Sequence, residues 1–141
     1  MGFFSDLKNK VTGGGATVRL QVSGVRRGAA SPVQVQAQAK ANGKVSAVYL
    51  LVRATETASW KGENNSTVSN SKVSYENKIQ IGGAFELKEG QTYDFQGQIE
   101  LPHNVNPTLN GSLINHVWEV QAGLDMPGND PDSGWQKIDV A

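Results

Sequence analysis

Apolar and polar residues alternate along much of the chain, which is the pattern of strands with one face in a core and the other in water. In the segment 32–41, Val and Ala occupy every second position from Val33 onwards, and the residues between them are Gln and Lys. A helix would scatter these side chains around its surface, whereas a strand places each set on one face. The same alternation runs through residues 92–101 and 118–126. We therefore predict strands in these three segments.

Shorter runs of alternating or β-branched residues predict further strands, and glycine-containing turn sequences separate them. These runs cover residues 17–22, 44–57, 72–81, 84–87 and 135–140. Asn42 and Gly43 follow the strand 32–41 directly and predict a two-residue hairpin, because both residues readily take a positive φ. Alternation, rather than continuous apolar runs, favours antiparallel sheets with one wet face.

The predicted fold is therefore all-β: a two-layer antiparallel sandwich of the immunoglobulin-like or arrestin-like kind, with seven or eight strands over residues 16–141. One stretch resists the strand pattern. Residues 59–71 are almost entirely Ser, Thr, Asn, Gly and charged residues. We interpret them as a long polar loop with Trp60 at its root.

The start of the chain carries a different pattern, which fits a short amphipathic helix over residues 1–12. Three glycines at residues 13–15 follow and predict a flexible linker. The apolar side chains Phe3, Phe4 and Leu7 are candidate contacts with a protein partner or a membrane interface. The alternative is that they dock on the sandwich and cap an open end of its core.

Composition narrows the function classes. The chain has 141 residues, enough for one domain, and no Cys, which excludes disulfides, thiolate zinc sites and cysteine nucleophiles. Its 13 basic and 13 acidic side chains give no net charge, which argues against a dedicated nucleic-acid binder. No apolar run is long enough to span a membrane, and the start lacks the apolar core of a secretion signal. We predict a cytoplasmic protein without a cofactor.

The zero net charge is made of two opposed halves. Residues 1–70 hold nine basic and three acidic side chains, whereas residues 71–141 hold four and ten. Because one folded domain interleaves its halves, we expect local neutralisation between neighbouring strands. The alternative is a dipolar surface that favours self-association or a charged partner.

Catalytic candidates are few. His103 and His116 are the only histidines, and neither belongs to a Gly-x-Ser-x-Gly elbow or a His-Glu-x-x-His motif. His103 lies in a proline-bracketed turn and His116 lies beside Trp118 at the entrance to a strand. We predict structural or surface roles for both histidines, and no enzymatic activity.

One acidic segment, residues 129–134, faintly resembles the first half of a calcium-binding loop. Pro131 interrupts the pattern, and Ala occupies the position where such a loop ends in Glu. We predict an ordinary turn before the last strand. A weak cation site that uses Asp125, Asp130 and Asp132 is the alternative.

Short motifs along nearly the whole chain, taken together and in order, resemble the bacterial sporulation-control protein M family. The motifs are Met1-Gly2-Phe3-Phe4, Val25-Arg26-Arg27-Gly28, Asn42-Gly43, residues 85–91, Leu101-Pro102 with Pro107, residues 117–125, Asp130-Pro131-Asp132 and Ile138-Asp139-Val140. The resemblance implies an intracellular arrestin-like sandwich that acts through protein contacts, in stress, sporulation or cytoskeleton-associated regulation. Arrestin-like proteins usually pair two sandwiches, and this chain has the length of one. The groove between two sandwiches would therefore need a second copy.

We accordingly predict a non-catalytic protein-interaction or scaffold domain, with protein partners of unknown identity. An exposed edge strand of the sandwich could also join two copies into a homodimer. The alternative function is a small-ligand or carbohydrate-binding sandwich that uses Trp60, Trp135 or the polar segment 59–71.

Overall fold

The computed structural model of the protein describes residues 15–141. The predicted helix over residues 1–12, with the candidate contacts Phe3, Phe4 and Leu7, lies outside the described residues, as do the first two glycines of the predicted linker. Within the described part, no helix has the length and apolar character needed to cross a membrane.

Ten strands and one short 3-10 helix make up the described part, and all the strand pairs are antiparallel. The strands are β1 (Ala16–Val22), β2 (Ala30–Ala39), β3 (Gly43–Val45), β4 (Ala47–Lys61), β5 (Thr67–Gly82), β6 (Phe85–Leu87), β7 (Thr92–Glu100), β8 (Leu109–Asn110), β9 (Ile114–Asp125) and β10 (Gln136–Ile138), and the 3-10 helix η1 spans Glu63–Asn65. This count exceeds the predicted seven or eight, because β3 and β4 are separate strands and β8 escaped prediction.

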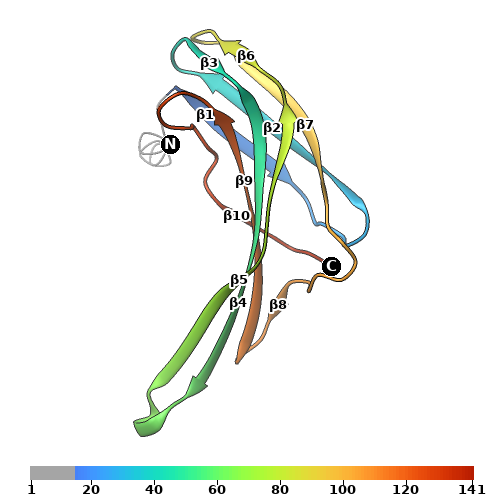
Figure 1. Ribbon diagram of the computed structural model, residues 1–141, viewed down its shortest axis with the longest axis vertical. Helices are drawn as coiled ribbons and strands as arrows, with labels where there is room; N and C mark the ends of the chain where they lie inside the picture. Colours follow the sequence, from blue (N-terminus) through green and yellow to red (C-terminus); the bar gives the residue numbers. More distant parts are fainter. Residues whose placement is uncertain (1–14) are drawn as a thin grey trace.

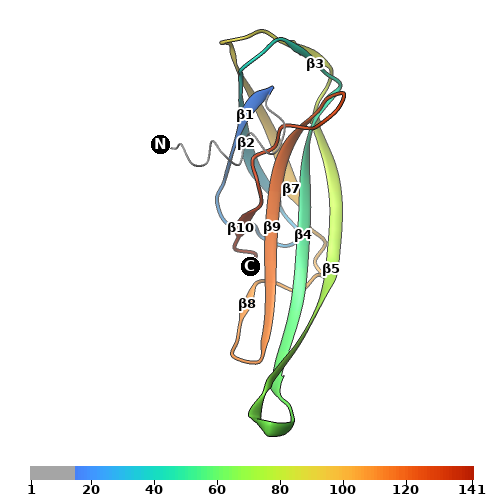
Figure 2. The same ribbon diagram turned by 90° about the vertical axis from the view of Figure 1, so that its left-hand side faces the viewer.

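The strands form two layers that face each other (Figures 1 and 2). One layer has the order β1–β2–β7, and the other has the order β10–β9–β4–β5 with β8 beside β9. β3 and β6 form a separate two-stranded ribbon at the end of the molecule that is uppermost in Figure 1. The predicted all-β antiparallel sandwich is confirmed.

The core lies between the two layers and follows the predicted alternation. In β2, Val33, Val35, Ala37 and Ala39 are buried while the residues between them are exposed. The largest fully buried side chain is Trp118 of β9, and its indole N–H donates a hydrogen bond to a backbone carbonyl. One set of alternating residues thus fills the core and the other faces water, as the sequence predicts.

The predicted hairpin at Asn42 and Gly43 is wrong, because the flanking strands pair elsewhere: β2 with β1 and β7, and β3 with β6. Neither residue has a positive φ. Instead, the Asn42 side-chain oxygen accepts a hydrogen bond from the N–H of Glu89 at 2.8 Å, which joins two connections at the ribbon. The predicted strand 44–57 is likewise divided at Ser46, where the chain passes from the ribbon into the larger layer.

The predicted polar loop over residues 59–71 is also wrong. β4 and β5 continue through this stretch as paired strands, with Lys61 opposite Thr67 as the last pair. A tight turn joins them, and it is closed by a hydrogen bond of 2.8 Å from the N–H of Gly62 to the carbonyl oxygen of Ser66. Polar Ser, Thr and Asn side chains occupy positions on both faces of this hairpin, and both faces are accessible to water.

The turn is possible because Asn64 and Asn65 adopt φ values of 61° and 60°, a left-handed conformation that Asn tolerates better than most residues. Residues 55–73, which we call the arm, project away from the sandwich as a long hairpin (Figures 1 and 2). A β-bulge at Ser74 marks the root of the arm, since the β4–β5 register shifts there.

Candidate interaction surface

The face of β4 that points into the core continues onto the arm. β4 stays in unbroken register with β9 from Ala47 to Ala58, so alternate residues of β4 keep to one face. Val52 and Ala54 are buried on this face in the body of the sandwich. Glu56 follows on the same face and forms an ion pair of 3.7 Å with Lys72 of β5; beyond this pair come Ala58 and Trp60, where the arm leaves the body.

Neighbouring strands contribute further apolar residues to this face. Val68 of β5 pairs with Trp60, and Ile114 of β9 pairs with Ala58. In β8, Leu109 pairs with His116 of β9. His116 lies two positions after Ile114, so Leu109 and Ile114 are on the same face of the sheet. We call these five side chains the apolar arm face.

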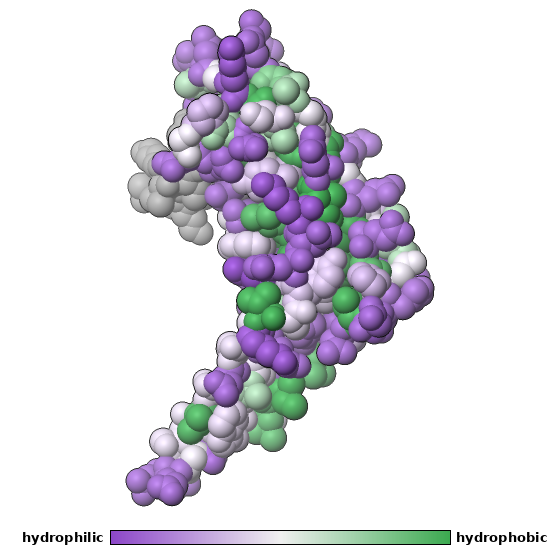
Figure 3. All heavy atoms as spheres, in the orientation of Figure 1, coloured by the Kyte–Doolittle hydropathy of each residue, from purple (hydrophilic) through white to green (hydrophobic). Residues whose placement is uncertain are grey.

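Most of the apolar arm face is open to water, although it continues a face that is fully buried elsewhere. The exposed fractions are 46% for Trp60, 38% for Val68, 49% for Leu109 and 50% for Ile114. Trp118, on the same face of β9 inside the body, is 0% exposed. Hydrophobic atoms gather where the arm leaves the body, near β8 and the start of β9 (Figure 3). The sheet of β4, β5 and β9 therefore extends beyond the opposite layer, which covers its core face only in the body of the sandwich.

A buried histidine fixes the root of the arm. The Nδ1 atom of His116 lies 2.9 Å from the carbonyl oxygen of Pro107 and donates a hydrogen bond to it, because a carbonyl can only accept. The Nε2 atom lies 2.7 Å from the hydroxyl of Ser74, at the bulge, and the ring stands edge-on to Trp118. These contacts hold His116 inside the fold, whereas His103 is exposed at the surface.

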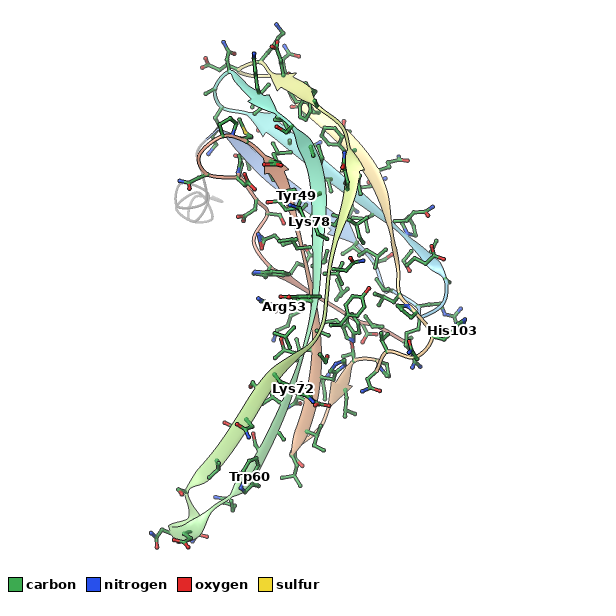
Figure 4. All side chains as sticks on the ribbon, in the orientation of Figure 1. Tyr49, Arg53, Trp60, Lys72, Lys78 and His103 are labelled. Atoms are coloured by element: carbon green, nitrogen blue, oxygen red, sulfur yellow. The ribbon has the colours of Figure 1, made fainter. Side chains whose placement is uncertain are left out.

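The two exposed tryptophans do not form one platform. Trp60 belongs to the apolar arm face, whereas the Trp135 ring lies over the guanidinium of Arg53, with 3.9 Å between Cζ and the ring centroid. Arg53 and Trp60 are seven residues apart on β4 and therefore point to opposite faces, as Figure 4 allows the reader to follow. Arg53 also pairs with Glu119 at 3.0 Å, a contact between the basic and acidic halves of the chain. Local neutralisation thus occurs at this pair, as predicted.

The acidic segment before β10 uses its carboxylates within the fold. Asp130 accepts hydrogen bonds from the hydroxyl of Tyr49 at 2.8 Å and from the N–H of Met126 at 3.0 Å. Asp132 accepts one from the N–H of Gly134 at 2.8 Å. Within residues 15–141, no three His, Asp or Glu side chains gather as a metal site would require. These carboxylates hold a turn.

Tyr49 is 6% exposed, and burial together with its hydrogen bond to Asp130 raises the pKa of its hydroxyl above the ordinary value of 10.0. We expect Tyr49→Phe to lower the free energy of unfolding at pH 7 by about 1 kcal/mol, through loss of this hydrogen bond. The unfolded chain ionises Tyr49 near pH 10 while the folded protein retains the proton, so stability of the parent protein falls as pH rises above that value. The phenylalanine variant lacks this loss.

Urea unfolding at pH 7 and pH 11 checks the prediction. The parent's advantage of about 1 kcal/mol at pH 7 should change by about 1.4 kcal/mol over this interval, so that at pH 11 the variant is as stable as the parent or slightly more stable. Tyr75 and Tyr93 are present in both proteins, so the comparison isolates the change at position 49. A difference that stays constant or grows would contradict the assignment.

Comparison with known proteins places the fold. No family model matches the chain, and no curated protein matches it in sequence. Among solved structures, Spo0M, the sporulation control protein from Bacillus subtilis, matches with a TM-score of 0.64 and 17% identity, over 90% of this chain and 49% of that chain. The chain thus spans about half the length of the solved protein it matches. This structural match confirms, at the level of the fold, the resemblance seen in the sequence.

Proposed function

We propose that the chain is a non-catalytic protein-interaction domain that binds its partner through the apolar arm face. The observation that carries the proposal is the exposure of Trp60, Val68, Leu109 and Ile114 on a face that forms the core elsewhere in the same sheet. Contiguous apolar surface is costly to leave in water and marks contact sites on folded proteins.

The composition of the arm supports a contact with protein rather than with a charged polymer. Over the whole arm the charged residues are Glu56, Lys61, Glu63 and Lys72, two of each sign, which cancel. Tryptophan is enriched among the residues that contribute most to protein interfaces, and Trp60 lies near the end of the arm (Figure 4). Apolar and uncharged polar side chains favour a protein surface over nucleic acid.

The structural likeness to a sporulation control protein fits a regulatory role exerted through such contacts. We extend that role to this chain as part of the proposal. The carbohydrate-binding alternative requires neighbouring aromatic rings, and the two exposed tryptophans lie on opposite faces of the sheet.

Site-specific photocrosslinking tests the proposal. A benzophenone amino acid replaces Trp60 in one variant and Gln36, an exposed residue of the other layer, in the matched control. On irradiation in the native cell, we expect several-fold more protein adducts from position 60 than from position 36. A second change, Val68→Lys, should reduce the adducts at position 60 because it places a charge on the apolar arm face. Equal adduct yields from both positions, unaffected by Val68→Lys, would contradict the proposal.

A further inference from the structure

Among residues 15–141, the backbone hydrogen-bonding groups on the outer edge of β5 in the arm have no partner. The N–H of Ser59 donates to the carbonyl oxygen of Leu113, on the β9 side of β4. The backbone of Ser59 therefore points away from β5, and its opposite residue Ser69 points away from β4. By the same alternation, Thr67 and Ser71 also direct their N–H and carbonyl groups outward, beyond the sheet.

This edge lacks the features that usually protect exposed strands. Such edges are blunted by Lys, Pro, bulges or a covering element. Residues 67–71 contain only Thr, Val, Ser and Asn, and the register of β5 is regular through them. The first charge, Lys72, and the bulge at Ser74 lie beyond this segment, toward the body. The edge is thus open to pairing with another strand.

We propose that a second copy of this chain pairs with this edge, antiparallel, across a two-fold axis that passes beside Val68. This inference rests on the proposed function and names the partner of the arm. In this register, Thr67 lies opposite Ser69 of the second copy, and each such pair exchanges both backbone hydrogen bonds because both residues point outward. The edge is complementary to itself, as a two-fold interface requires.

The side chains favour this register over its neighbours. Val68 meets Val68 of the second copy in a non-hydrogen-bonded pair, in which side chains approach most closely. Trp60 lies beside Val68 on the same face, so one apolar row of Trp60 and Val68 from each copy crosses the dimer. A register centred on Ser69 would instead place Val68 against the amide of Asn70.

Charge also fits a second copy. In the proposed register, the turn of one copy, with the exposed carboxylate of Glu63, lies alongside Lys72 of the other. The Lys72 side chain forms an ion pair of 3.7 Å with Glu56 of its own arm and is still 74% exposed, so Glu63 of the second copy would join an existing pair at the surface. Figure 4 shows Lys72 on the arm, between its root and Trp60. The two-fold axis repeats this opposite-charge contact, and it brings no like charges into register along residues 67–71.

The absence of cysteine from the chain allows a direct test of the register. In Val68→Cys, the two introduced thiols lie in directly opposite positions, where Cβ atoms are about 4.5–5.5 Å apart, and they should form an intermolecular disulfide under mild oxidation. The matched control Asn70→Cys lies on the same face of the same strand, but its two copies are not opposite each other. We expect covalent dimer from Val68→Cys to form roughly tenfold faster than from Asn70→Cys.

Sedimentation of the unmodified full chain supplies the second measurement. The mass should rise with concentration from 15.1 kDa toward twice that value. Ser69→Pro removes an outward N–H without breaking a bond to β4, and should weaken dimerisation roughly tenfold or more. Ser71→Thr keeps the N–H at an equivalent edge position and should leave dimerisation unchanged.

A strict monomer at high concentration, together with equal disulfide rates for the two cysteine variants, overturns the second-copy inference. Photoadducts from position 60 to a different protein would then leave the proposed function standing. Loss of those adducts as well would overturn both.

Discussion

Replacing Trp118 by alanine is expected to lower the free energy of unfolding by about 3–5 kcal/mol, the largest loss of any single change considered. The side chain is 0% exposed, and its indole N–H donates to the carbonyl oxygen of Asn106 at 2.9 Å. Its ring also packs against Tyr75, with 5.3 Å between ring centroids. Alanine leaves a cavity and an unpaired carbonyl in place of these contacts, and urea unfolding followed by circular dichroism measures the cost.

Trp60→Ala is the matched control, because it removes the same side chain from an exposed position. At low protein concentration, where the arm has no partner, we expect its effect to stay within about 0.5 kcal/mol. Equal losses from the two substitutions would mean that Trp60 is buried in solution. That result would contradict the exposure on which the apolar arm face rests.

The body of the sandwich could be predicted from the sequence because most of its strands have one face in the core and one in water. In β2, Val33 and Val35 face the core, and the Gln residues that alternate with them face water. The hairpin predicted at Asn42 and Gly43 failed for a different reason. Its turn signal is local, whereas long-range pairing of β3 with β6 decides where the chain goes.

The arm escaped prediction because its alternation is short, limited to Ala58 and Trp60 in β4 and Val68 in β5, and the surrounding Ser, Thr and Asn suggested a loop. A usable signal was present in the paired asparagines Asn64 and Asn65, which tolerate a left-handed turn, between two stretches that contain Thr, Val and Trp. The predicted contacts Phe3, Phe4 and Leu7 lie outside the described residues and stay predictions.

The candidate surface could not be assembled from the sequence at all. Trp60 stands out by its type, but Leu109 and Ile114 lie some fifty residues away and belong to other strands. Only the pairing of β4 with β9, and of β9 with β8, brings them to one face. The unpaired edge of β5 could not be predicted from the sequence either. It follows from the sheet order, in which β4 is the only described strand that pairs along β5.

His116 connects the stability of the body to the placement of the arm. Its ring joins the carbonyl of Pro107, in the connection before β8, to the hydroxyl of Ser74 at the bulge where the arm begins. Both the strand that carries Leu109 and the strand that carries Val68 are therefore tied to one buried side chain. A change at this position should affect the apolar arm face as well as the core.

His116→Leu is expected to lower the free energy of unfolding by about 2–3 kcal/mol, because leucine of similar size leaves the Pro107 carbonyl unpaired and removes the bond to Ser74. Hydrogen exchange in residues 55–73 should become faster, since the root of the arm loses its tie. Ser74→Ala keeps the bond to Pro107 and should cost only about 1 kcal/mol. Equal losses from the two variants would place the stabilising contact at Ser74, and unchanged exchange in the arm would show that His116 supports the core alone.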